Sequence, residues 1–160
     1  MGTSTRHVEK SQTRPNKRTT KNAQRIGAHY CLTFPLVYAL DTNAIIYYIK
    51  DDQSAVDFLR DILASPDSPV YVSAITEAEL FGFPSLTDTE ATLINDLLGG
   101  VSIIPIDSYI ARTAGRIRAT YRLKLADSLV AATAIFTSSA VVTRNVRDFR
   151  KVPTISIQHL

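Results

Sequence analysis

Residues 34 to 43 read Phe-Pro-Leu-Val-Tyr-Ala-Leu-Asp-Thr-Asn, an apolar run that ends abruptly in a carboxylate. An unbroken apolar run of this kind is typical of a strand buried on both faces, and we predict a strand over residues 36–40. Asp41 follows directly at the carboxyl end of that strand. A carboxylate at the edge of a buried element is costly without a counter-charge, so its presence calls for a structural or chemical reason.

The chain beyond this strand alternates predicted helices with predicted strands. Helical spacing, capping residues and Gly or Pro stops predict helices over 42–50, 54–63, 73–81, 87–98, 108–122 and 126–136. Short apolar runs predict strands over 70–72, 101–106, 140–143 and 154–157, the last of them at an edge. This alternation predicts an α/β fold of three layers, α/β/α, around a central, mostly parallel sheet of about five strands.

Four acidic residues stand in settings that suit one shared site. They are Asp41, Glu79, Asp127 and Asp148. Ligands of open parallel sheets bind beyond the carboxyl ends of the strands, and these acids follow strands or begin helices where they can point into one crevice. Converging carboxylates repel each other unless a cation lies between them. A site for Mg²⁺ or Mn²⁺ is the simplest reason to gather them.

Each acid also has a purely structural interpretation. Asp41 could be a helix N-cap, and Asp127 could interact with a helix dipole in a first turn. Glu79 could be a surface acid, with its neighbour Glu77 as the functional one. Asp148 could be a loop acid paired with Arg147 or Arg150. Taken one at a time these interpretations are the stronger ones, and only the set of four favours a metal site.

Composition places the chain among globular proteins of a reducing compartment. It has 160 residues, 45% of them hydrophobic, which suits about one domain. A single cysteine, Cys31, excludes an internal disulfide framework, and the three histidines lie near the chain ends. No apolar run is long enough to cross a membrane, and no secretory signal stands out. We therefore expect a cytoplasmic protein with no membrane partner.

Charge divides the chain into two parts. Residues 1–30 carry seven Lys and Arg against one Glu, a net +6, so the remaining residues carry a net −3. We predict that residues 1–33 form a basic, disordered extension and that residues 34–160 form one domain. The extension is either an arm that binds nucleic acid through phosphate contacts or a segment without a role.

Four segments together resemble the PIN-domain ribonucleases of the VapC type, the toxin half of bacterial and archaeal toxin–antitoxin pairs. The matching segments occur in family order: Leu40-Asp41-Thr42-Asn43, Ile75-Thr76 with Glu79-Leu80 and Gly82, residues 125–134 around Asp127, and Thr143-Arg144-Asn145 with Asp148-Phe149. Each motif is weak alone, and four in order are fairly specific. The resemblance runs from about residue 36 to the end.

The resemblance implies a metal-dependent endoribonuclease that hydrolyses RNA phosphodiester bonds. It implies that Asp41, Glu79, Asp127 and Asp148 are the catalytic, metal-binding residues, holding Mg²⁺ or alternatively Mn²⁺. It further implies that Thr42, Asn43, Thr143 and Asn145 orient those acids or water. The chain departs from the family at Asn145, where relatives often carry an acid, so either Asn145 or Asp148 completes the site.

The resemblance also implies an RNA substrate, a cognate antitoxin and a homodimer. A groove for an antitoxin helix could lie between residues 44–63 and 73–98, and its aromatic candidates are Tyr47, Tyr48, Phe58, Phe81 and Phe83, unless these are ordinary core residues. The arginines of the helix over 108–122 are either phosphate contacts or an ordinary solvated face.

Two other functions remain open from the residues alone. The first is a PIN-like module that binds RNA or protein without catalysis, which Asn145 favours and the retained acids oppose. The second is a phosphatase resembling the haloacid dehalogenases, which also begin with a strand ending in Asp. Those enzymes need a second Asp two residues later, where this chain has Asn43.

Overall fold

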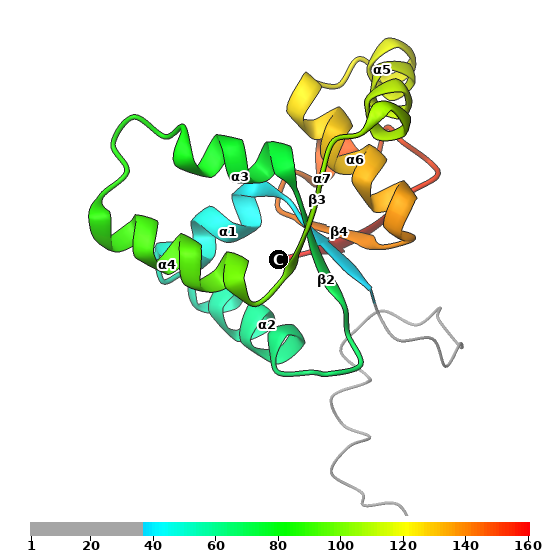
Figure 1. The fold of residues 1–160 in the computed structure, drawn as a ribbon. Coiled ribbons are helices and arrows are strands. Elements are labelled where there is room, and N and C mark those ends of the chain that lie inside the picture. Colours follow the sequence, from blue (N-terminus) through cyan, green and yellow to red (C-terminus); the bar gives the residue numbers. More distant parts are fainter. Residues whose placement is uncertain (1–36) are drawn as a thin grey trace, which may run out of the picture. The chain divides into compact units, whose positions relative to one another are not determined.

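A computed structural model of the protein describes residues 37–160, which form an α/β domain (Figure 1). The strands are β1 (Tyr38–Leu40), β2 (Val70–Ser73), β3 (Ser102–Ile104), β4 (Ala140–Thr143) and β5 (Ser156–His159). The helices are α1 (Thr42–Ile49), α2 (Gln53–Leu63), α3 (Ala74–Phe81), α4 (Asp88–Gly99), α5 (Ser108–Tyr121), α6 (Leu125–Thr137) and α7 (Val146–Phe149).

The five strands make one sheet in the order β3-β2-β1-β4-β5, and every pairing is parallel. The predicted three-layer fold with a parallel sheet is therefore confirmed. β1 is the central strand, with Leu40 in register with Val72 of β2 and Val142 of β4. The residue after Leu40 is thus placed at the middle of the carboxyl edge of the sheet.

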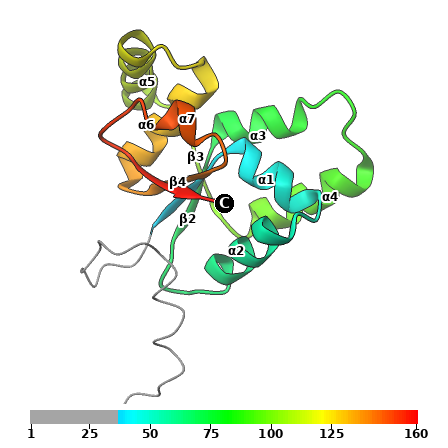
Figure 2. The ribbon, with the colours of Figure 1, turned by 180° about the vertical axis from the view of Figure 1, so that it is seen from behind.

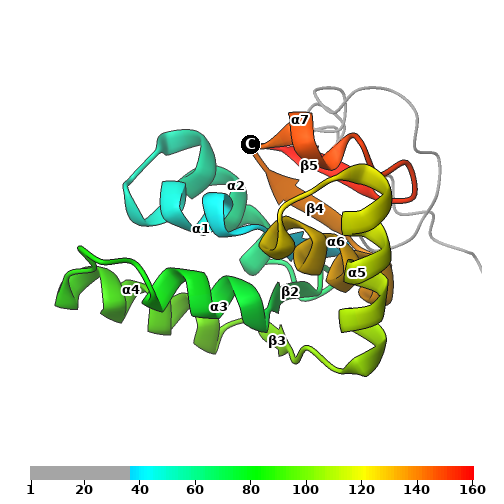
Figure 3. The ribbon, with the colours of Figure 1, turned by 90° about the horizontal axis from the view of Figure 1, so that it is seen from above.

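Helices cover both faces of the sheet, with α1 to α4 on one side and α5 to α7 on the other (Figures 1, 2 and 3). Strand residues alternate between two separate cores, as the twofold period of a strand requires. Leu40 and Val142 pack into the core beneath α1 to α4, whereas Ala39 and Val141 pack against α5 and α6. Burial on both faces explains why the strands read as unbroken apolar runs.

Several element boundaries differ from the predicted ones. β3 is shorter than predicted because Pro105 lacks an N–H for the ladder, and β5 begins two residues later than predicted. The short helix α7 was not predicted, since four residues are too few to show helical spacing. Ser73 precedes α3 as predicted, but its hydroxyl makes no cap bond and instead accepts one from Thr133 at 3.1 Å.

The predicted capping box of α4 is present. The Thr87 hydroxyl accepts from the Glu90 amide, and the Glu90 carboxylate accepts from the Thr87 amide. The prediction for residues 1–33 lies outside the described residues. Among residues 37–160, no helix combines the length and the apolar character that crossing a membrane requires.

Candidate acidic site at the carboxyl edge of the sheet

Asp41 is the most deeply buried acid of the described domain, with 3% of its surface exposed. It occupies the N-cap position of α1, yet its side chain makes no cap hydrogen bond. Its Oδ2 instead accepts from the Thr143 hydroxyl at 2.7 Å and from Asn43 Nδ2 at 3.3 Å. Burial raises the pKa of Asp41, and the hydrogen bonds from Thr143 and Asn43 oppose that rise only in part. The structural interpretation of Asp41 as a capping residue therefore does not explain its side chain.

Glu79 lies on α3 and is tied to the helix that follows Asp41. The Thr42 hydroxyl donates to Glu79 Oε2, a contact between residues 37 positions apart. The Glu79 charge in turn contributes to the raised pKa of Asp41. Thr42 thus positions one predicted site acid beside another, whereas the side chain of the neighbouring acid Glu77 has no such hydrogen bond to any of residues 37–160.

Asp127 lies in the first turn of α6. Its pKa is raised to about 6, first by burial and then by the negative charges of Asp41, Asp148 and Glu79, while the Lys124 ammonium opposes the rise. A carboxylate that only interacted with the helix dipole would have a lowered pKa. The raised pKa of Asp127 therefore indicates that the charges of the other three predicted acids reach it.

Asp148, the fourth predicted acid, is already paired with a cation. It lies on α7, its Oδ1 accepts from Lys151 Nζ, and its amide donates to the Asn145 carbonyl at 3.2 Å. Hydrogen bonds from Lys151 and Asn145 lower the pKa of Asp148. The pairing foreseen with Arg147 or Arg150 is made with Lys151 instead. The backbone amide of Asn145 donates to the Thr143 hydroxyl at 2.9 Å, the same hydroxyl that donates to Asp41.

Arg144 supports the site in a way that sequence reasoning missed. Its guanidinium bonds the Asp52 carboxylate and the Ser54 hydroxyl and lies 3.9 Å from the Tyr47 ring centroid. Arg144 follows Thr143, so this contact ties the loop after β4 to the turn between α1 and α2. No local signal announces a pair 92 residues apart. Lys151, three residues after Asp148, could have been found from its spacing.

The donor chemistry of this space fits Mg²⁺ or Mn²⁺, which prefer oxygen ligands and carboxylates above all. Two of its carboxyl groups, Asp41 and Asp127, have raised pKa values, so the space disfavours their anionic forms unless a cation compensates. Within residues 37–160, no three His, Cys, Asp or Glu side chains are drawn together closely enough to hold one ion. The fit therefore lies in the donor set and its charge, with Asp41, Glu79, Asp127 and Asp148 as the candidate ligands.

A second feature of the domain is a small apolar pocket between α1, α3 and α4. Its walls are almost wholly apolar, with Lys50 and Glu90 at the margin. The other lining residues are Ile46, Ile49, Leu80, Phe83, Leu86 and Ile94.

The aromatic residues suggested for a docking groove divide between this pocket and other places. Phe83 lines the pocket and Phe81 is exposed nearby on α3. Phe58 packs edge-on against Tyr38, with ring centroids 5.6 Å apart, and belongs to the core. Tyr47 stacks beneath Arg144. The pocket lies in the predicted region, but fewer aromatic side chains form it than predicted.

Fold and site together define an α/β domain whose acidic residues gather at the carboxyl edge of a parallel sheet. A family model for the PIN domain matches residues 38–155. The chain therefore belongs to the PIN domain family, and the resemblance noted from its motifs is confirmed.

Two similar proteins are named as VapC nucleases, a narrower group than PIN domains as a whole. Ribonuclease VapC10 of Mycobacterium tuberculosis is 30% identical over 115 residues, which cover 69% of this chain and 84% of the relative. The tRNA(fMet)-specific endonuclease VapC of Salmonella typhimurium is 28% identical over 131 residues, covering 77% of this chain and 97% of the relative.

Solved structures agree on the fold. VapBC2 of Rickettsia felis, bound to a promoter DNA fragment, matches with a TM-score of 0.67 at 22% identity, over 78% of this chain and 99% of that one. A toxin–antitoxin complex from Klebsiella pneumoniae matches with a TM-score of 0.63 at 27% identity, over 77% of this chain and 99% of that one.

Proposed function

We propose that the protein is a metal-dependent endoribonuclease and the toxin of a VapC-like toxin–antitoxin pair. The observation that carries this proposal is the position of the acids at one edge of the sheet, where burial first and then the charges of Asp41, Asp148 and Glu79 raise the pKa of Asp127. Relatives similar over most of the chain are named ribonuclease and endonuclease, which supports the same reaction. A non-catalytic module would have no reason to keep Asp41 and Asp127 where burial and neighbouring charges disfavour their anionic forms.

The roles of the side chains follow from their contacts. Asp41, Glu79, Asp127 and Asp148 would hold Mg²⁺ or Mn²⁺ beside the scissile phosphate. The bound metal would supply a nucleophilic water at neutral pH and neutralise charge on the phosphate. Thr143 and Asn43 hold the Asp41 carboxylate in one orientation, and Thr42 does the same for Glu79. Such hydrogen bonds fix ligand geometry before the substrate arrives.

Asn145 and Asp148 are the two candidates for the fourth residue of the acidic site, and they have different contacts. Asn145 uses its amide and carbonyl to shape the turn after β4, while Asp148 supplies the charge that reaches Asp127. We infer that Asp148 completes the acidic set and that Asn145 supports it. Lys151 competes with the metal for Asp148, so Asp148 would contribute least to metal affinity.

The apolar pocket between α1, α3 and α4 would receive an antitoxin segment. An amphipathic helix that lays apolar residues into a groove is a common way to bind such a surface. Solved relatives in this fold are described as VapBC and toxin–antitoxin complexes, which supports a protein partner. A homodimer remains part of the proposal by resemblance to the family.

Cleavage of total RNA by the purified, antitoxin-free protein tests the proposal. We expect cutting with Mg²⁺ or Mn²⁺, no cutting with EDTA, and no cutting by Asp41→Asn under either condition. Asp96→Asn on α4 is the matched control, since it removes the same charge from another part of the domain and should cut normally. A folded protein that leaves RNA intact with both metals would contradict the nuclease assignment.

A further inference from the structure

Helix α5 presents an exposed face whose charge is strongly one-sided. Between residues 108 and 126 the chain contains five cations and no acid. All five are exposed: Arg112, Arg116, Arg118, Arg122 and Lys124. The ion pairs found within residues 37–160 use Arg60, Arg144 and Lys151, so no carboxylate neutralises the α5 arginines. Arg116 makes one weak contact, from Nη2 to the Thr113 hydroxyl at 3.4 Å.

The arginines form two rows along the helix rather than a random scatter. At 100° per residue, Arg112 and Arg116 lie on one edge of the exposed face and Arg118 lies on the other, and Arg122 comes directly after the helix ends at Tyr121. Between the rows the exposed residues are small, namely Ala111, Gly115 and Ala119. The floor between the rows is therefore low, and a Cβ added at Gly115 would meet nothing within 4 Å. Within the helix, from Arg112 to Arg118, the arginines extend over about 9 Å at 1.5 Å per residue.

Helix stability does not account for these positions. Cations are favourable in the last turn of a helix, which suits Arg118, but this effect fades beyond that turn and leaves Arg112 and Arg116 unexplained. Arg122 follows the helix with φ 56°, a left-handed conformation that usually belongs to glycine. A long charged side chain is kept at this position against the backbone preference, which points to a use for the side chain itself.

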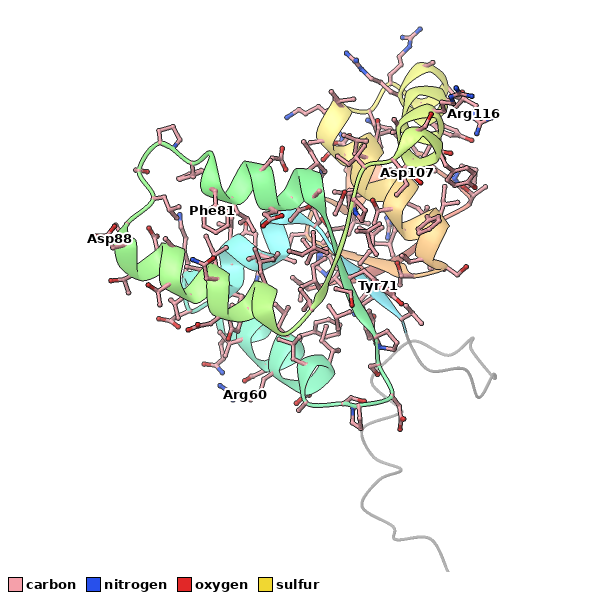
Figure 4. All side chains as sticks on the ribbon, in the orientation of Figure 1. Arg60, Tyr71, Phe81, Asp88, Asp107 and Arg116 are labelled. Atoms are coloured by element: carbon pink, nitrogen blue, oxygen red, sulfur yellow. The ribbon has the colours of Figure 1, made fainter. Side chains whose placement is uncertain are left out.

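The basic face ends beside the acidic site. Lys124 precedes α6, and its ammonium is near enough to Asp127 to oppose the rise in the pKa of that acid. Figure 4 shows Arg116 projecting outward from α5, well away from Arg60 on α2. We propose that the exposed face of α5 binds the sugar–phosphate backbone of a single RNA strand and leads it to the acids around Asp127. This inference rests on the RNA substrate of the proposed function.

Charge selects this occupant over a second copy of the chain. A twofold dimer through the same face would place the α5 arginines of one protomer against those of its partner. Repeated phosphates match two rows of guanidinium groups, which bind phosphate oxygens with paired hydrogen bonds. Small residues between the rows let a backbone approach the helix closely.

Binding of a fluorescein-labelled oligouridine of about 12 nucleotides tests the inference, with the full chain carrying Asp41→Asn and EDTA present so that nothing is cut. Anisotropy at several salt concentrations gives the affinity and its salt dependence. Arg118→Gln with Arg122→Gln should weaken binding at least about tenfold at low salt and lower the salt slope by about 1.4, since each contact to a single strand contributes about 0.7. Arg60→Gln on α2 should change neither quantity.

A second comparison separates binding from folding. Arg122→Gly relieves the left-handed backbone and should keep or raise the Tm while weakening oligouridine binding several-fold. Ser138→Gly is the matched control, because Ser138 ends α6 with φ 54° and carries no charge. It should leave oligouridine binding unchanged. Unchanged affinity in Arg122→Gly, or an unchanged salt slope in the double variant, would overturn the inference.

The two proposals fail in different ways. If α5 arginines govern oligouridine binding while the unmodified protein cuts no RNA, the nuclease assignment fails and only the binding of RNA by α5 stands. If RNA is cut and the salt slope is unchanged, the inference alone fails. A dimer that dissociates in Arg118→Gln, with oligouridine binding intact, would give this face to a second copy of the chain and overturn the inference as well.

Discussion

Replacing Asp127 with asparagine should stabilise the metal-free protein at neutral pH. The pKa of Asp127 is raised from 3.8 to about 6 in the folded domain, so ionising this group costs more in the folded state than in the unfolded chain. A difference of about 2 pH units corresponds to at most about 3 kcal/mol, at about 1.4 kcal/mol per unit. Because Asp127 is only half buried, solvent screening reduces this to about 1–2 kcal/mol.

The raised pKa of Asp127 also fixes the direction in which the free energy of unfolding changes with pH. Between about pH 3.8 and 6 the folded state holds a proton that the unfolded state has released, so stability of the original protein falls as pH rises through this window. The asparagine side chain of the Asp127→Asn variant would stay neutral throughout. The gain in the free energy of unfolding should therefore be near zero at the acid end and reach about 1–2 kcal/mol above pH 6.

Urea unfolding with EDTA at about pH 4.5 and pH 7.5 measures this difference. Asp148→Asn is the control, since Lys151 already compensates Asp148 and no gain is expected at the higher pH. Adding Mn²⁺ should stabilise the original protein more than Asp127→Asn, because a ligand stabilises the state that binds it. An Asp127→Asn variant that is equally destabilised at both pH values would refute the picture of four acids around one space.

Three further predictions follow from single contacts. Thr143→Val removes the hydrogen bond to Asp41 and should lower the free energy of unfolding by about 2 kcal/mol in urea titrations and weaken metal binding about 10–100-fold in calorimetry. Arg144→Ala should cost about 1–2 kcal/mol of unfolding free energy through loss of its Asp52 and aromatic contacts, and Arg144→Lys should recover only part of it. Phe83→Ser, on a half-exposed side chain of the apolar pocket, should abolish co-purification with an antitoxin while leaving the Tm nearly unchanged.

The sequence is most informative where its patterns are local. Strands buried on both faces read as apolar runs, so the parallel sheet and the place of Asp41 at its carboxyl edge were predictable. The capping box at Thr87 was predictable because its partners are three residues apart. Element boundaries that depend on a single residue were harder to predict, such as the end of β3 before Pro105.

Contacts between distant segments have no local pattern in the sequence: the resemblance assigned Thr143 to orienting the site acids or water without naming its partner, and the Arg144 contact was not predicted. The bond from Thr143 to Asp41 spans 102 positions, and the one from Arg144 to Asp52 spans 92. Neither has a periodicity or spacing that a reader of the sequence could detect, since only the folded sheet brings the segments together. The apolar pocket likewise depends on how α1, α3 and α4 pack. The sequence therefore predicted the region in which it lies but not the residues that line it.

Two neighbouring glutamates on α3 offer the most direct test of the central claim, that Asp41, Glu79, Asp127 and Asp148 form one metal-dependent nuclease site. Thr42 donates a hydrogen bond to Glu79, whereas the Glu77 side chain has no such partner in the described part of the chain. RNA cleavage and Mn²⁺ binding should be measured side by side for Glu79→Gln and Glu77→Gln. We expect Glu79→Gln to lose at least about 100-fold in kcat/KM and to bind Mn²⁺ more weakly, because even a group that only supports a ligand costs about 10–100-fold when removed. Glu77→Gln should retain both properties, and equal behaviour of the two variants would contradict the site.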